Sequence, residues 1–152
     1  MHGYLTEDEH ASWRAWVTAS RKLNDLLGRT LQDGQGISMA DFEILGRLAE
    51  ADSNSMRMKE LAQQMVCSRS RLSHQIDRLE RAGLVARQHC PTDGRGLYAV
   101  LTARGEKAYR AAAPDHADGI RANFFGTLSR RDIEAITKAC VKLTATIDHT
   151  PA

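Results

Sequence analysis

The chain has 152 residues, 42% of them hydrophobic, which is enough to bury one ordinary core and predicts a single folded unit. It has no run of about 20 apolar residues of the kind that spans a membrane, and its N-terminal sequence lacks the basic and apolar regions of a secretory signal, so we expect a cytoplasmic protein with no membrane partner. The net charge is +2, but residues 56–95 carry eight Lys or Arg against four Asp or Glu, a balance that suits an anionic partner.

The first predicted helix starts after Thr6, which forms a capping-box signature with Glu9. Its apolar residues recur at helical spacing: Trp13, Trp16, Val17, Leu23, Leu27 and Leu31. We expect this helix to end at about Gln32, because residues 33–36 read Asp-Gly-Gln-Gly, which breaks a helix.

Three shorter helices are predicted next. Ser38 can cap the first, which should end before the polar residues 52–55, and the second should contain residues 59–65. Ser68 is a candidate cap for the third, and Gly83 is placed to end it. The residues expected to face inward are Phe42, Leu45, Leu48 and Ala49 in the first and Leu72, Ile76 and Leu79 in the third.

After Gly83 the pattern changes to two short strands, 84–87 and 97–101, joined by a loop rich in Pro and Gly. Thr102 can cap a further helix, which Pro114 should interrupt or kink. A last helix should follow Ser129, and its apolar residues alternate at spacings of 3 and 4: Ile133, Ile136, Cys140, Leu143 and Ile147. Such a narrow seam is more typical of helix pairing than of a broad core face, and it predicts a homodimer.

The two helices that flank Val66-Cys67-Ser68 form a candidate helix-turn-helix, whose second helix would enter the major groove of double-stranded DNA. Its outward-facing residues form a set of hydrogen-bond donors: Ser68, Arg69, Ser70, Arg71, Ser73, His74, Gln75 and Arg78. Asp77 is the acidic exception, and we expect it to hold the helix or to orient an arginine. Lys59 and Arg87 are expected to meet phosphates. The alternatives are a solvated helix face, or a winged-helix protein-interaction module that does not bind DNA.

The hairpin loop favours DNA binding. Arg95 at its tip suits insertion into a narrow minor groove, where negative potential is focused, and Asp93 can fix the guanidinium in place. The alternative is a surface ion pair of little energetic value.

At this point the sequence resembles the MarR family of bacterial regulators, and more loosely its actinobacterial branch. The resemblance is carried by Lys59-Glu60-Leu61-Ala62, residues 68–73, residues 77–85, Asp93-Gly94-Arg95 and Leu101-Thr102, in this order and spacing. The sequence departs from the family pattern at Arg57, where many relatives have a Ser or Thr cap. It also departs at Cys67, where similar sequences often carry a large aromatic residue; a small apolar residue packed in the turn is the favoured interpretation.

The resemblance implies a mainly α fold with a small β-hairpin wing, a winged helix-turn-helix flanked by dimerisation helices. The corresponding division is an N-terminal dimerisation helix at 1–36, a DNA-binding lobe at 37–105 and C-terminal dimerisation helices at 106–152. It also implies a transcriptional regulator, commonly a repressor, that binds a pseudo-palindromic operator as a homodimer and is often released by a small ligand. DNA contacts carried over onto this chain fall on Ser68, Ser70, Arg71, Ser73, His74 and Arg78 for the helix, and on Arg95 for the wing.

Trp13 and Trp16 could line a pocket for a small aromatic or phenolic effector, although tryptophans at this spacing more often serve core or dimer packing. The three scattered cysteines lack the spacing of a zinc site, and no pair among the six histidines has the spacing of a helical metal site. None of the recognised catalytic motifs is present, so we expect no enzyme activity, no catalytic residue, no metal and no cofactor.

Overall fold

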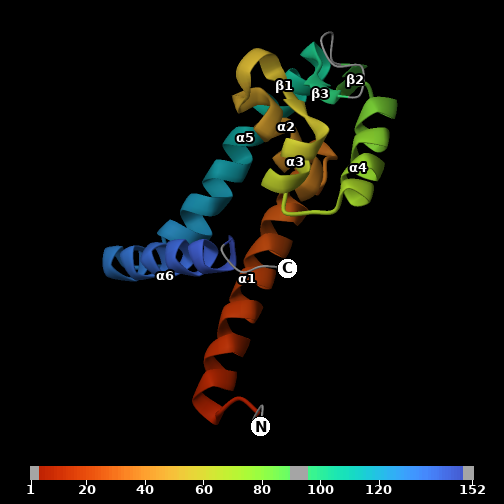
Figure 1. The fold of residues 1–152 in the computed structure, drawn as a ribbon. Helices are drawn as coiled ribbons and strands as arrows, with labels where there is room; N and C mark the ends of the chain where they lie inside the picture. The colour runs from red at the N-terminus through yellow and green to blue at the C-terminus, as the bar shows by residue number, and fades with distance from the viewer. Residues whose placement is uncertain (1–3, 90–95, 149–152) are drawn as a thin grey trace. The chain divides into compact units, whose positions relative to one another are not determined.

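The computed structural model describes residues 4–89 and 96–148 (Figure 1). The chain forms two compact units, residues 1–116 and 117–152. The helices are α1 (Glu7–Gln35), α2 (Met39–Glu50), α3 (Met58–Gln64), α4 (Arg69–Arg81), α5 (Ala103–Ile120) and α6 (Arg130–Asp148). The strands are β1 (Ser55–Arg57), β2 (Val85–His89) and β3 (Leu97–Leu101), with a short 3-10 turn at Asp52–Asn54 and a π-helical turn at Arg121–Phe125.

The helix N-termini form where capping side chains stand in the sequence. Thr6 Oγ1 accepts the N–H of Glu9 at 3.3 Å, and the Glu9 carboxylate accepts the N–H of Thr6 at 2.8 Å, which confirms the expected capping box. Ser38 and Ser68 cap α2 and α4 as expected. The end of α1 was predicted too early: it continues to Gln35, and Gly36 then closes it with a left-handed backbone, φ 69°.

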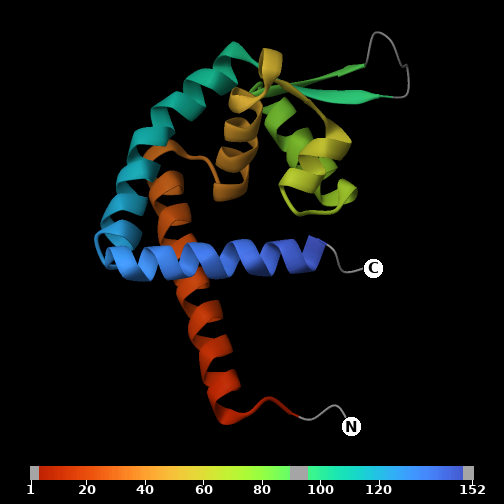
Figure 2. The same ribbon diagram turned by 60° about the vertical axis from the view of Figure 1, so that its left-hand side comes forward.

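The main core lies between α2, α3 and α4 and the sheet. Completely buried residues from all of these helices meet there: Ile44, Leu45, Leu48, Leu61, Leu72 and Ile76. The sheet is antiparallel in the order β1-β3-β2, and β2 and β3 continue outward as a hairpin beyond the helices (Figure 2). The expected pair of strands is therefore confirmed, and β1 is an addition to it.

A second, smaller core joins the end of α1 to α2 and α5. Leu31, Ile37, Phe42 and Ala112 are buried together, and the Phe42 ring lies 5.1 Å from that of Tyr109 and 4.5 Å from that of His116. These contacts lie on both sides of Pro114, and α5 runs past this proline as one helix to Ile120. An interruption at Pro114 is thus wrong, and the alternative of a kink there stays a prediction.

The tight start of α5 joins it to the end of the sheet. Thr102 caps the helix by accepting the N–H of Gly105 at 3.0 Å, as expected, and its hydroxyl lies 2.8 Å from the carbonyl oxygen of Gly83. A Cβ atom on Gly105 would lie 2.0 Å from the Leu84 carbonyl oxygen, so only glycine fits there. Gly83 itself ends α4 with φ 70°.

The second unit consists of the π-helical turn and α6. Ser129 caps α6, with its Oγ accepting the N–H of Asp132 at 3.3 Å. Within the unit, Ile133, Ile136 and Cys140 are half-buried, whereas Leu143 and Ile147 are exposed. Across the residues that the structure describes, no helix is long and apolar enough to cross a membrane.

Candidate nucleic-acid interface

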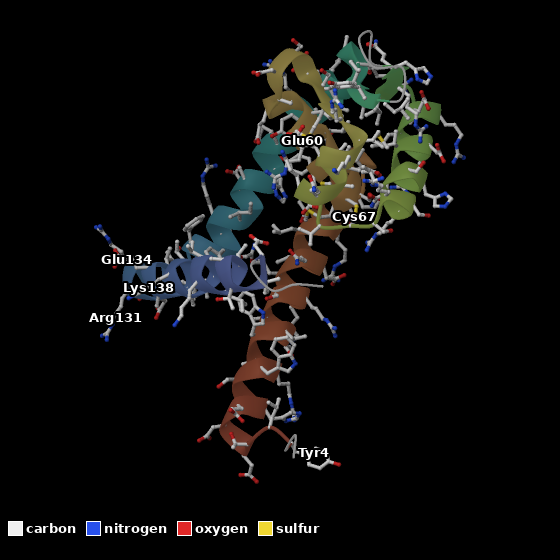
Figure 3. The ribbon with its side chains drawn as sticks, viewed as in Figure 1. Tyr4, Glu60, Cys67, Arg131, Glu134 and Lys138 are labelled. Atoms are coloured by element: carbon white, nitrogen blue, oxygen red, sulfur yellow. The ribbon has the colours of Figure 1, made fainter. Side chains whose placement is uncertain are left out.

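The connection between α3 and α4 is a tight turn. The N–H of Cys67 donates to the carbonyl oxygen of Ala62 at 3.1 Å, and Val66 adopts a left-handed backbone, φ 49°, with its side chain exposed. Cys67 lies in this connection (Figure 3), half-buried and packed at the edge of the main core, which agrees with the interpretation of a small apolar residue in the turn. Together the turn and its two helices have the expected helix-turn-helix arrangement.

The outer face of α4 carries the predicted DNA-binding side chains. Its apolar stripe of Leu72, Ile76 and Leu79 is buried against the core. The remaining face is polar: Ser68, Arg69, Ser70, Arg71, His74 and Arg78 are exposed, and Ser73 and Gln75 are half-buried. The structure therefore brings eight predicted site residues together on one helix and its cap, whereas Asp93 and Arg95 lie outside the described residues.

Arg78 differs from the other donors, because it is joined to a second helix. Its guanidinium donates to Asp41 Oδ1 at 2.5 Å, and the hydroxyl of Ser38 donates to the other oxygen of the same carboxylate at 2.7 Å. Asp41 is buried near the start of α2, while the Arg78 side chain stays 53% exposed. This pair fixes α4 to α2, a role for Arg78 that the sequence pattern did not indicate.

Arg87 on β2 forms a clamp across one side of α4. Its guanidinium binds Asp77 and Glu80, each at 2.6 Å, and donates to the Ser73 carbonyl oxygen at 3.0 Å. The N–H and then the guanidinium of Arg87 lower the pKa of Glu80 by hydrogen bonding to its carboxylate. Asp77 orients an arginine, as expected. Arg87 itself was expected to meet phosphate, which stays a prediction; in the structure its guanidinium is engaged by Asp77, Glu80 and Ser73.

A cationic hollow of about 530 Å³ lies between the start of α4 and the sheet. Its lining comes from three segments: Arg57, Met58 and Lys59, then Arg69, Ser70 and Ser73, then Gly96 and Leu97. Arg57 was noted in the sequence only as an unusual residue before α3, and it makes no side-chain cap there. Its place beside α4 depends on the pairing of β1 with β3, which local sequence spacing does not reveal.

Neither Trp13 nor Trp16 lines the hollow along α1. They are 59% and 47% exposed, and that hollow is lined by Glu7, His10, Ala11, Arg14, Ala15 and Thr18. Their role in effector binding remains a prediction. Among the described residues, no three His, Cys, Asp or Glu side chains lie close enough to hold a metal ion.

Comparison with known proteins gives a consistent result. The MarR family model matches residues 37–97. The chain is 34% identical over 95 residues to the transcriptional regulator HosA of Escherichia coli O111:H-, an alignment that covers 62% of this chain and 70% of HosA. Among solved structures it is similar to AbsC of Streptomyces coelicolor, with 38% identity, a TM-score of 0.92 and coverage of 97% and 99% of the two chains. It is also similar to Sco3205 of the same organism in complex with DNA, with 35% identity, a TM-score of 0.91 and coverage of 98% and 96%.

Proposed function

Because this chain belongs to the MarR family, we propose that it is a transcriptional regulator that binds a pseudo-palindromic operator in double-stranded DNA as a homodimer and represses the adjacent gene. The carrying observation is the donor-rich outer face of α4, set beside the antiparallel strands β2 and β3. Its relatives are regulators rather than enzymes, and we propose no catalytic activity for this chain and a cytoplasmic location.

Helix α4, which is proposed to enter the major groove, is proposed to read base edges through Arg71 and His74. Both side chains are exposed, and no contact that the structure describes ties them to another element as Arg78 is tied to Asp41. Loss of a base contact is worth about 1–3 kcal/mol and relaxes preference at one base pair, whereas loss of a phosphate contact weakens all sequences alike.

The test starts by selecting bound duplexes from a random library and measuring mobility shifts at two salt concentrations. Arg71→Ala or His74→Ala should relax preference at single positions of the selected operator, and Lys59→Ala should weaken every duplex by a similar factor. Uniform weakening by both of the first two variants would contradict direct readout by this face. Failure of the wild type to shift any duplex at low salt would favour the protein-interaction module instead.

The homodimer is proposed to form through the apolar seam of α6 together with α1. Leu143 and Ile147 are exposed in the protomer, and a stripe of this kind is usually covered by a partner. Ile136→Asp combined with Leu143→Asp should give a monomer in sedimentation at micromolar concentration. Lys138→Asp is the matched control, since this residue lies with Arg131 and Glu134 on another face of α6 (Figure 3). A wild-type monomer at that concentration would refute the dimer.

We further propose that a small aromatic or phenolic effector releases the DNA by binding beside Trp13 and Trp16. The supporting observation is limited to two exposed indoles one helical turn apart on α1. Phenolic acids that release the operator should quench tryptophan fluorescence, and Trp13→Phe with Trp16→Phe should weaken that release. Unchanged release by this double variant would place the effector elsewhere.

A further inference from the structure

The cationic hollow lies between the two parts of the lobe that are proposed to enter DNA grooves. Arg69, Ser70 and Ser73 line it from the first turns of α4, while Gly96 and Leu97 line it from the base of the hairpin. In duplex DNA a major and a minor groove are separated by one sugar–phosphate strand. A helix in the major groove and a hairpin reaching the adjacent minor groove therefore straddle that strand. The hollow between them is where the strand has to pass.

The chemistry of the hollow matches a phosphodiester. Arg57, Lys59 and Arg69 give it three positive charges, Ser70 and Ser73 add hydroxyl groups, and none of the described residues that line it is acidic. All three cationic residues are exposed. Arginine and lysine carry most of the affinity for DNA by neutralising phosphates, and hydroxyl groups donate to the same oxygens.

Arg57 is the best-positioned of the three cations. Its Nε donates to the Tyr98 hydroxyl at 3.0 Å, and its guanidinium carbon lies 5.4 Å from the centre of the Tyr98 ring. Arg57 and Tyr98 are also paired residues of β1 and β3. A guanidinium held by a ring, a hydroxyl group and a backbone ladder loses less side-chain entropy on binding than a lysine on a flexible stem.

We infer that this hollow seats the DNA strand between the two grooves, and that Arg57, braced by Tyr98, binds one backbone phosphate in it. The inference rests on the proposed function, because it needs α4 in the major groove. The consequence is that the phosphate in the hollow fixes the position of α4 along the major groove. It contributes nothing to the choice of base.

The salt dependence of binding gives the first test. Each lost phosphate contact reduces the slope of log K against log salt by about 0.9, and a homodimer carries every substitution twice, so Arg57→Gln should reduce the slope by about 1.8. Between 50 and 200 mM salt the wild type should then lose about 12-fold more affinity than Arg57→Gln. Arg47→Gln is the matched control, because it removes the same charge from an exposed residue of α2 that does not line the hollow. Its slope should remain that of the wild type.

The second test locates the phosphate. Methylphosphonates placed one at a time along the selected operator remove single backbone charges. A methylphosphonate at one position per half-site should weaken DNA binding by the wild type but have no effect on binding by Arg57→Gln. Tyr98→Phe should weaken binding less than Arg57→Gln does, and it should leave the salt slope unchanged. Melting temperatures check that the variants fold, and Lys59→Gln provides a second variant of the same hollow, expected to lose its own phosphate nearby.

Three results would overturn the inference. An unchanged slope in Arg57→Gln and in Lys59→Gln would show that the hollow does not hold the backbone. Equal effects of every methylphosphonate on the wild type and Arg57→Gln would show that Arg57 only supports the sheet. The third result combines two observations. Inorganic phosphate at constant ionic strength competes with DNA for the wild type but not for Arg57→Gln, and no methylphosphonate position affects the wild type and Arg57→Gln differently. The hollow would then bind a free oxyanion and not the DNA backbone. A wild type that binds no duplex is a different failure, since it refutes the proposed function before any variant is compared.

Discussion

Replacing the clamp residue Arg87 by methionine tests whether the helix and the hairpin act as one rigid body. Methionine keeps an unbranched side chain of similar length but removes the guanidinium that binds Asp77, Glu80 and the Ser73 carbonyl oxygen. These three partners lie on successive turns of α4, and Arg87 lies on β2. The variant should therefore loosen the hairpin relative to α4 while leaving both elements formed.

The size of the effect follows from the exposure of the groups. The Arg87 side chain is 19% exposed, but Asp77 and Glu80 are 44% and 40% exposed, so both carboxylates can rehydrate when the arginine is lost. Each ion pair then contributes about 0.5 kcal/mol, and with about 1 kcal/mol for the hydrogen bond to Ser73 the loss is about 2 kcal/mol. For a chain of this length that corresponds to roughly 4–8 °C in melting temperature.

The assay combines thermal unfolding with operator titration at several salt concentrations. Binding by Arg87→Met should weaken with an unchanged salt slope, unlike binding by Arg57→Gln, because the Arg87 guanidinium is already engaged by Asp77, Glu80 and the Ser73 carbonyl oxygen. The share of the stability difference that Glu80 carries should be full at pH 7, and it should be lost as pH falls below the ordinary range of a glutamate and through the lowered pKa of Glu80. A reduced slope, or stability equal to the wild type at pH 7, would refute the clamp.

Three further outcomes are expected. Gly105→Ala should destabilise the protein by about 3 kcal/mol or more, because its Cβ would lie 2.0 Å from the Leu84 carbonyl oxygen. The control Gly28→Ala, whose Cβ would lie 3.8 Å from its nearest neighbour, should be neutral or stabilising, and equal melting curves for the two variants would contradict this. Burial lowers the pKa of His116, so wild-type stability should fall as pH drops below about 6.5, where the unfolded chain takes up the proton first, and His116→Phe should show a smaller fall. Arg95→Ala should weaken DNA binding and lower the salt slope, with a smaller loss for Asp93→Ala, and tighter binding by the latter would show that Asp93 only repels DNA.

Local sequence signals predicted much of this fold because they act over a few residues. Thr6, Ser38 and Ser68 each cap a helix three residues before the N–H that they accept, and the 3-4 spacing of Leu72, Ile76 and Leu79 places them on one buried face. These features need no knowledge of tertiary structure.

The features that sequence reasoning missed depend on distant partners. β1 has three residues, too few for an alternating pattern, and it exists because β3 pairs with it. Asp41 and Arg78 are 37 residues apart, and their pairing follows from how α2 packs on α4. Arg87 was expected to meet phosphate because an arginine in a basic segment looks available, and only the fold shows its carboxylate partners.

The strained turn at Val66 has a consequence for how this lobe could be improved as a reagent. A β-branched residue with φ 49° and a 92% exposed side chain combines an unfavourable backbone with no gain from burial within the protomer. Asparagine or glycine tolerates that backbone far better, so either would relieve strain without disturbing the core. Either substitution in the connection between α3 and α4 should therefore raise the stability of the lobe, which would help crystallisation or NMR at elevated temperature.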